Sequence, residues 1–256
     1  MEKLGKDLKI LAVFAHPDDE TMFLGGTLAY LAAQGAAVHY LSATRGEGGE
    51  MGAPPICKRE ELGRIRENEL RCAVKALGGA SLAFLGFVDP EVGREGELYP
   101  FSEKKRSLIE GLKPHLDKIQ PDVILTHGPA GEYGHPAHIQ THQGVMKAVD
   151  DMGFAPRALY APSWLSRETG KFTPAPGIVV DISPWMKEKV AAVNCHRSQH
   201  GLFLRHGSSR AGRPVNIPEM VRAEEAFCRI LPESDREKDP FKALLQPISM
   251  NSPLRE

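Results

Sequence analysis

The sequence predicts an α/β protein: a Rossmann-like, mostly parallel sheet with helices on both faces and a C-terminal extension. Two observations support this prediction. Short apolar runs alternate with helical patterns over about the first 150 residues, which is typical of strand–helix–strand units. Clusters of polar residues follow directly after several of the apolar runs, as in open α/β sheets whose ligands bind at the carboxyl ends of the strands.

The first half of the chain contains the clearest elements. We expect strands at residues 8–15, 37–44, 81–87 and 122–127, and helices at roughly 20–34, 59–77 and 103–119. Gly35 and Gly78 follow two of these helices, as left-handed C-terminal caps favour. Repeated strand, helix and strand predict a parallel sheet that is covered on both faces.

The second half is less regular. It predicts strands at 158–164 and 176–183, and helices at 183–196 and 217–231. Residues 203–216 are rich in Gly, Ser and Arg without an apolar period, so we expect a loop there that could act as a mobile lid. Residues 1–232 are predicted to form one domain, and residues 233–256 a peripheral tail that could serve a homo-oligomer contact.

Composition excludes several classes of protein. Lys and Arg number 32 against 33 Asp and Glu, and this net charge of -1 gives no field that would attract nucleic acid or an anionic membrane surface. The N-terminal apolar run is too short to cross a bilayer and too broken for a signal peptide. The four cysteines are widely spaced without a CxxC pair, so we expect neither disulfides nor a cysteine zinc site, and a cytoplasmic location.

The stretch AHPDDE follows the first predicted strand and places His16, Asp18 and Asp19 at its carboxyl end. Successive side chains of an extended chain point to different sides, so the two aspartates should do different jobs. Pro17 stiffens the turn between the imidazole and the carboxylates. An aspartate could simply cap the following helix, but capping explains neither His16 nor the second carboxylate. A metal site explains all three side chains.

The stretch EYGHPAHIQTH follows the fourth predicted strand and offers His135, His138 and His142. If Pro136 begins a helix, His135 is its cap and His138 and His142 share one face. His138 belongs to both of the ligand pairs that this spacing allows. His16, Asp19 and His138 would form a two-histidine, one-carboxylate site with a position open for water, typical of catalytic zinc. The same ligands also suit iron(II). Asp18 then becomes the obvious general base.

Together, AHPDDE, TRGEGGE at 44–50 and THGPAGEYGHPAH at 126–138 resemble the LmbE-like, or PIG-L, deacetylases, which include the deacetylases of mycothiol and bacillithiol synthesis. The resemblance covers most of residues 8–200. It implies a Rossmann-like fold, one Zn²⁺ per chain, and hydrolysis of the N-acetyl group of a small N-acetylglucosamine conjugate.

The resemblance also implies roles for individual residues. The metal ligands would be His16, Asp19 and His138. The catalytic groups would be Asp18 as base, with His135 and Tyr133 at the oxyanion. The substrate-binding residues would be Arg66, Asp89 and His196, although from the residues alone these could equally be a solvated helix charge, a turn residue before Pro90 and a helix cap.

Residue 137 departs from the family pattern, which usually reads HPDH. Ala137 stands where the aspartate would orient the preceding histidine, so we expect a lowered pKa for His135 unless another group such as Glu132 substitutes. Two alternatives therefore stay open: a metal-dependent amidase for a non-sugar amide, and a catalytically weak family member that acts as a binding module.

Overall fold

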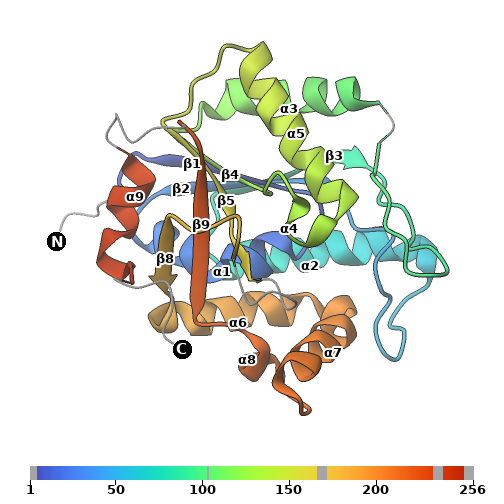
Figure 1. Cartoon of the computed structure of the whole chain (residues 1–256). Helices are drawn as coiled ribbons and strands as arrows, with labels where there is room; N and C mark the ends of the chain where they lie inside the picture. The colour runs from blue at the N-terminus through green and yellow to red at the C-terminus, as the bar shows by residue number, and fades with distance from the viewer. Residues whose placement is uncertain (1–4, 103, 166–171, 233–238, 251–256) are drawn as a thin grey trace.

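The computed structural model describes residues 5–102, 104–165, 172–232 and 239–250. In this part of the chain, seven strands form one sheet in the order β3-β2-β1-β4-β5-β9-β8 (Figure 1). These strands are β1 (Lys9–Phe14), β2 (Ala37–Thr44), β3 (Ser81–Phe87), β4 (Val123–Thr126), β5 (Ala158–Pro162), β8 (Ile178–Asp181) and β9 (Glu224–Leu231). β6 (Trp164–Leu165) and β7 (Phe172–Thr173) form a separate small hairpin.

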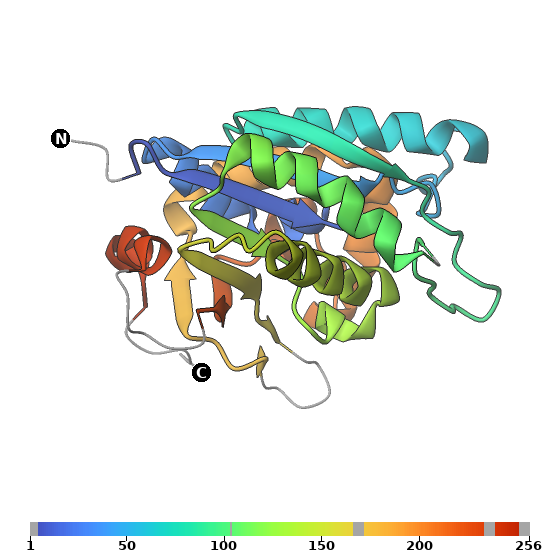
Figure 2. The same cartoon turned by 90° about the horizontal axis from the view of Figure 1, so that it is seen from above.

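The helices have the following bounds: α1 (Asp19–Ala33), α2 (Leu62–Ala76), α3 (Lys105–Ile119), α4 (Gly131–Gly134), α5 (Pro136–Asp151), α6 (Met186–Cys195), α7 (His200–Ala211), α8 (Ile217–Met220) and α9 (Pro240–Leu245). Helices α3 and α5 cover one face of the sheet, and α1, α2 and α6 cover the other (Figures 1 and 2). No helix in the described ranges is long and apolar enough to cross a membrane.

β1 shows why the sheet is buried on both faces. Its apolar residues alternate between the two core clusters: Ile10 and Phe14 pack with α1 and α2, whereas Leu11 and Val13 pack with α3 and α5. A strand whose residues are apolar from Ile10 to Phe14 fits only between two helical layers. The predicted Rossmann-like α/β class is confirmed.

The topology places the site. β1 pairs in parallel with β2 on one side and with β4 on the other. The chain therefore winds outward from β1 in both directions, and the crevice between the carboxyl ends of β1 and β4 is the switch point where ligands bind in such sheets. AHPDDE follows β1, and the histidine-rich stretch follows β4, so both predicted site loops meet at this crevice.

Two predictions for the second half are wrong. Most of the predicted loop at 203–216 belongs to α7, whose buried Phe203 and Gly207 pack against α8. The predicted helix at 217–231 is instead the single turn α8 followed by β9. β9 runs antiparallel between β5 and β8, where Ala226, Phe227 and Cys228 are all buried. The pairing decides the conformation of a short apolar run that is ambiguous by period alone.

The described part of the C-terminal segment is not peripheral. Asp239 caps α9 by accepting hydrogen bonds from the Phe241 and Lys242 backbone N–H groups at 3.0 Å. The Phe241 ring is fully buried and packs against Tyr160 and Phe227 of the sheet. Residues 240–245 thus complete the core that α1 and α2 share.

The expectation of no disulfide is also wrong. Cys72 of α2 and Cys195 of α6 form a disulfide across a sequence separation of 123 residues. Spacing along the chain could not reveal this pair, because α2 and α6 become neighbours only when both pack on the same face of the sheet. Stable disulfides are rare in reducing compartments, so this pair removes the cysteine argument for a cytoplasmic location.

Candidate active site

The turn from β1 into α1 separates the two aspartates. Asp18 adopts a left-handed conformation with φ 104°, and Asp19 begins the helix. The Asp19 carboxylate accepts the His16 backbone N–H at 2.9 Å and faces the histidines, whereas Asp18 contacts Arg66 at 2.9 Å. As the sequence predicts, neighbouring carboxylates serve different partners.

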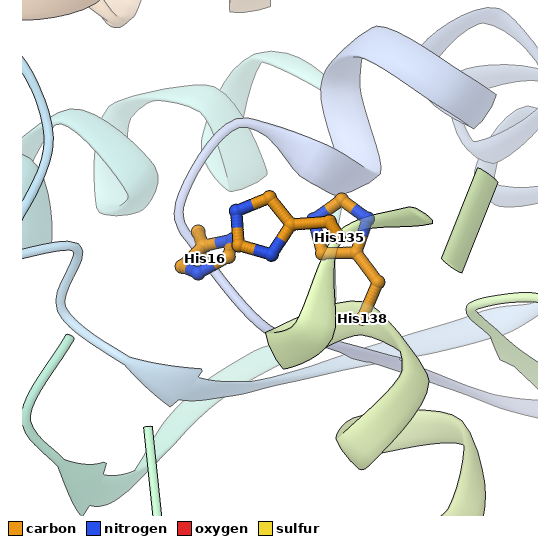
Figure 3. A group of neighbouring side chains, drawn as sticks. All are labelled: His16, His135 and His138. Carbon is orange, nitrogen blue, oxygen red and sulfur yellow. The ribbon is translucent and has the colours of Figure 1, made fainter. Parts of the chain in front are cut away.

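Three imidazoles approach the Asp19 carboxylate: His16 from the turn after β1, and His127 and His138 from the segment after β4. His16 Nδ1 lies 3.3 Å from one Asp19 oxygen, and His138 Nε2 lies 3.3 Å from the other. His127 Nε2 lies 3.3 Å from the same Asp19 oxygen as His16. Two overlapping groups could hold a metal among the described residues: His16, His135 and His138, and Asp19, His127 and His138. Figure 3 shows the first group, with the three imidazoles gathered at the start of α5. The rings of His16 and His138 lie 5.3 Å apart.

A second carboxylate stands behind each of these imidazoles. His16 Nε2 lies 3.1 Å from Asp89, and His138 Nδ1 lies 2.7 Å from Glu132. A carboxylate on one ring nitrogen fixes the proton there and leaves the other nitrogen free as a ligand. His138 Nε2 is buried and has no hydrogen-bond partner. This unpartnered nitrogen beside Asp19 is what a metal ligand requires, so the residues fit a divalent cation.

Glu132 and His127 were not predicted as part of this arrangement. Glu132 takes φ 58° and also contacts His127 Nδ1 at 2.9 Å, and the His127 ring stacks on His138 with centroids 3.8 Å apart. Their sequence signals are their place directly after β4 and their position inside the stretch THGPAGEYGHPAH. His142, the alternative ligand, lies outside both groups, and its Nδ1 is 2.8 Å from the His127 carbonyl oxygen. The structure therefore separates His142 from the candidate metal groups.

The electrostatics of the cluster favour a cation. Burial lowers the pKa of His16, but the carboxylates of Asp89 and Asp19 outweigh burial and raise it to about 10. Burial raises the pKa of Asp19, but His138 and His127 hold it well below its usual range. Burial likewise raises the pKa of Glu132, but His127 and His138 outweigh burial and lower this pKa to about 2. Carboxylates that stay ionised in a buried site need positive charge beside them.

Asp18 lies in a different environment. Burial raises its pKa to about 6, although the Arg66 guanidinium acts in the opposite direction. Arg66 is almost fully buried and also donates to the Gly46 carbonyl oxygen at 2.9 Å. Gly46 has φ 67°, and a side chain there would collide with the guanidinium, which explains one glycine of TRGEGGE.

His135 and Tyr133 border the cluster. His135 Nδ1 accepts the Ala137 backbone N–H at 3.2 Å, so a neutral ring carries its proton on Nε2. Burial and the nearby His16 lower the pKa of His135 to about 3, in the direction expected from the missing aspartate at position 137. Glu132 does not replace that aspartate, because its carboxylate contacts His127 and His138. Tyr133 is 53% exposed, and burial of its hydroxyl raises the tyrosine pKa.

The three predicted substrate-binding residues have protein partners. Arg66 contacts Asp18, Asp89 contacts His16, and His196 Nε2 lies 3.3 Å from the Thr21 hydroxyl and is fully buried. A cavity of about 620 Å³ is lined by Asp18, Asp19 and Tyr133. Arg66, Asp89 and His196 do not line this cavity. A sugar-binding role for Arg66, Asp89 and His196 stays a prediction.

Comparison with known proteins agrees with this geometry. Residues 11–149, more than half of the chain, match the family described as PIG-L, GlcNAc-PI de-N-acetylase. The chain belongs to the PIG-L family. A relative named 1D-myo-inositol 2-acetamido-2-deoxy-alpha-D-glucopyranoside deacetylase, from Mycobacteroides abscessus, is 31% identical over 75% of this chain and 81% of its own length. The chain spans only 56% and 53% of two other relatives with the same name.

Solved structures of other proteins share the PIG-L fold of this chain. N,N'-diacetylchitobiose deacetylase from Pyrococcus horikoshii is similar with a TM-score of 0.61 and 23% identity, over 87% of this chain and 83% of that one. GalB, the 4-carboxy-2-hydroxymuconate hydratase from Pseudomonas putida KT2440, is similar with a TM-score of 0.62 and 23% identity, over 90% and 99%. One is a deacetylase and the other a hydratase, so the fold alone does not assign the reaction.

Proposed function

We propose that this protein is a metal-dependent hydrolase that removes the N-acetyl group from an N-acetylglucosamine-type conjugate. The observation that supports this best is the pair of imidazoles at 3.3 Å from the two Asp19 oxygens, with Asp18 next to them on the cavity wall. The name of the Mycobacteroides abscessus relative, a deacetylase of an acetamido sugar, agrees with this chemistry.

His16, Asp19 and His138 would hold the metal. Two histidines and one carboxylate are typical of catalytic zinc, and the same set suits iron(II). A divalent metal bound there would polarise the acetyl carbonyl and lower the pKa of a water ligand to about 7. Asp89 and Glu132 would keep the two imidazoles in the tautomers that leave a nitrogen free for the ion.

Asp18 would be the general base. Its side chain lines the cavity, and Arg66 holds the carboxylate in place at 2.9 Å. Asp18 takes a proton from the attacking water, whose oxygen forms a bond to the acetyl carbon. The carbon–nitrogen bond then breaks, Asp18 returns the proton to the departing amine, and the products are acetate and a free amino sugar.

His135 and Tyr133 would stabilise the negative charge that develops on the acetyl oxygen. His135 is neutral at pH 7 because its pKa is lowered to about 3, so it can donate a hydrogen bond from Nε2 but cannot supply a proton to the amine. The raised pKa of Tyr133 keeps its hydroxyl protonated and therefore a donor. Proton transfer then falls to Asp18 alone.

The test combines metal analysis with an acetate-release assay. We expect one equivalent of zinc or iron(II) per chain, acetate release from N-acetylglucosamine conjugates, loss of activity with a chelator and recovery when metal is restored. A panel of non-sugar acetamides in the same assay separates a sugar deacetylase from a general amidase. A protein that binds no metal, or that binds metal and releases no acetate from any amide, would contradict the proposal.

Ala137 favours one further candidate, a family member that binds its ligand without efficient turnover. The residue leaves His135 without the aspartate that the family usually supplies, and the low pKa of His135 is consistent with that loss. Ala137→Asp distinguishes the two. Under the binding-module hypothesis, this variant should gain acetate release that the unaltered protein lacks.

A further inference from the structure

The cavity that starts at the catalytic residues extends well beyond them. It begins at Asp18, Asp19 and Tyr133 and continues between the β6–β7 hairpin, α7 and the end of α8. Its volume of about 620 Å³ is within the range of about 300–1,000 Å³ that encloses a complete drug-sized ligand. An acetamide group alone would fill only its inner end, so most of the cavity must hold another part of the substrate.

Aromatic rings form a continuous wall from the candidate metal ligands into this space. The Phe23 ring lies 6.1 Å from the ring of His138 and 5.9 Å from that of Trp164. Tyr133 joins the same two rings, with centroids 5.4 Å from His138 and 5.7 Å from Trp164. Trp164, which is only partly buried, therefore presents its ring at the point where the substrate leaves the catalytic groups.

The wall opposite the hairpin is apolar as well. Phe203, Met220 and Val221 are buried together in a small core cluster, and Met22 packs against it from α1. All four side chains also line the cavity. This wall offers dispersion contacts and no hydrogen bonds to a ligand.

Three other charged groups that line the cavity contact the protein itself. Lys189 Nζ lies 2.6 Å from Glu225, which also accepts the backbone N–H groups of Gly26 and Thr27 at 2.9 and 2.8 Å. Arg210 donates to the Met220 carbonyl oxygen. The exposed Arg222 and Glu224 carry opposite charges, so together they select neither an anion nor a cation.

From this lining we infer that the group attached to the N-acetylated sugar is apolar, an alkyl or aryl aglycone that packs against Trp164, Phe23 and the Phe203 cluster. The inference rests on the proposed deacetylation and names its substrate class. A polyhydroxylated acceptor, such as the inositol in the names of the relatives, would find hydrogen-bonding side chains at Ser163, Thr173 and His206 of this cavity, but it would bury its remaining hydroxyl groups against apolar side chains without hydrogen bonds.

The experiment compares acetate release from four N-acetylglucosaminides that differ only in the aglycone: methyl, n-hexyl, phenyl and inositol. We expect kcat/KM for the hexyl and phenyl conjugates to exceed that for the methyl conjugate at least tenfold, because each buried methylene or ring carbon adds hydrophobic stabilisation. Trp164→Ala should reduce the hexyl-to-methyl ratio at least fivefold. Tyr99→Ala, which removes a partly exposed ring outside the cavity, should leave the ratio unchanged.

A binding measurement tests the cavity without turnover. Hexyl glucoside has no acetyl group, and titration calorimetry should show that it binds the unaltered protein, binds Trp164→Ala at least fivefold more weakly, and outcompetes methyl glucoside. If no conjugate releases acetate, the proposed function fails, whereas the binding result still decides the inference. Equal kcat/KM for methyl, hexyl and phenyl conjugates, preference for inositol, or absence of hexyl glucoside binding would each overturn it.

Discussion

At the scale of single residues, Asp18 combines an unusual backbone with the proposed role of general base. Its φ of 104° lies in the left-handed region, which asparagine tolerates better than most other residues. Asp18→Asn should therefore fold and bind metal as the unaltered protein does, while kcat falls about 10²- to 10⁴-fold. Steady-state kinetics and metal analysis on the same preparation check both parts. Undiminished turnover would exclude Asp18 as the base.

The pH dependence of activity should also follow Asp18. A general base acts only when deprotonated, and its pKa is raised to about 6, so kcat/KM should be lost as pH falls below about 6. A bound cation would lower the Asp18 pKa, so the acidic limb of the pH profile, where kcat/KM is lost, would move to lower pH. Removing the Arg66 charge removes an interaction that lowers the Asp18 pKa, so Arg66→Gln should move the limb to higher pH. A limb that stays in place in this variant would contradict the assignment.

Glu132 should control metal affinity rather than the chemical step. A single carboxylate oxygen of Glu132 accepts from both His127 Nδ1 and His138 Nδ1, at 2.9 and 2.7 Å. Glu132→Gln loses the negative charge that orients these rings, so we expect metal affinity to fall about 10- to 100-fold. Competition with a chromogenic chelator measures the change. The exposed Glu110→Gln is the control, and equal affinities in the two variants would refute the role.

The residues of the site were predictable to the extent that the chain places them next to strand ends. His16 and His138 both lie 3.3 Å from Asp19, because parallel strands bring their carboxyl ends to one edge of the sheet. Their shared role as metal ligands stays a prediction. Glu132 was noted only as a substitute partner for His135, since its contacts depend on a left-handed backbone that the sequence does not display. Asp89, for which sugar binding stays a prediction, also contacts His16, and the sequence did not indicate this contact.

At the scale of secondary-structure elements, the disulfide joins two helices that frame the site. α2 carries Arg66, and Cys195 at the end of α6 directly precedes the buried His196. Linking residues 123 apart restricts the unfolded chain, which predicts a stabilisation of about 2–5 kcal/mol. Cys195→Ser should lower the free energy of unfolding by this amount in urea titrations. Cys57→Ser, which removes an unpaired thiol, is the control.

Reduction provides the complementary measurement for the disulfide. Dithiothreitol should lower the stability of the unaltered protein to that of Cys195→Ser and leave the variant itself unchanged. If the reductant has no effect on the unaltered protein, the two cysteines do not stabilise the fold through a covalent link.

The predictability of the elements also differs between the two halves of the chain. The parallel strands and covering helices of the first half follow from their own apolar periods, although several of their contacts, such as β1 with β4 and α2 with α6, join segments that are distant in the sequence. α7 and β9 could not be predicted in the same way. α7 has few apolar residues and packs on the short α8, and β9 acquires its conformation from pairing with β5 and β8. Local patterns are insufficient where distant contacts decide.

At the scale of the whole molecule, a buried ion pair connects the C-terminal strand to the N-terminal half. Glu225 of β9 accepts two backbone N–H groups of α1 and contacts Lys189 of α6 at 2.6 Å. Both side chains are almost fully buried. Removing one partner leaves the other charge buried and uncompensated, which typically costs more than the intact pair contributes.

Lys189→Met should therefore reduce the free energy of unfolding by about 3–5 kcal/mol, because the Glu225 carboxylate loses its cation inside the protein. Urea titration measures the effect, and Lys187→Met, at an exposed position of the same helix, is the matched control. The double variant Lys189→Met with Glu225→Gln should recover part of the loss, since no buried charge remains. If Lys189→Met were as stable as Lys187→Met, the pair would not hold β9, α6 and α1 together, and their packing would depend on apolar contacts alone.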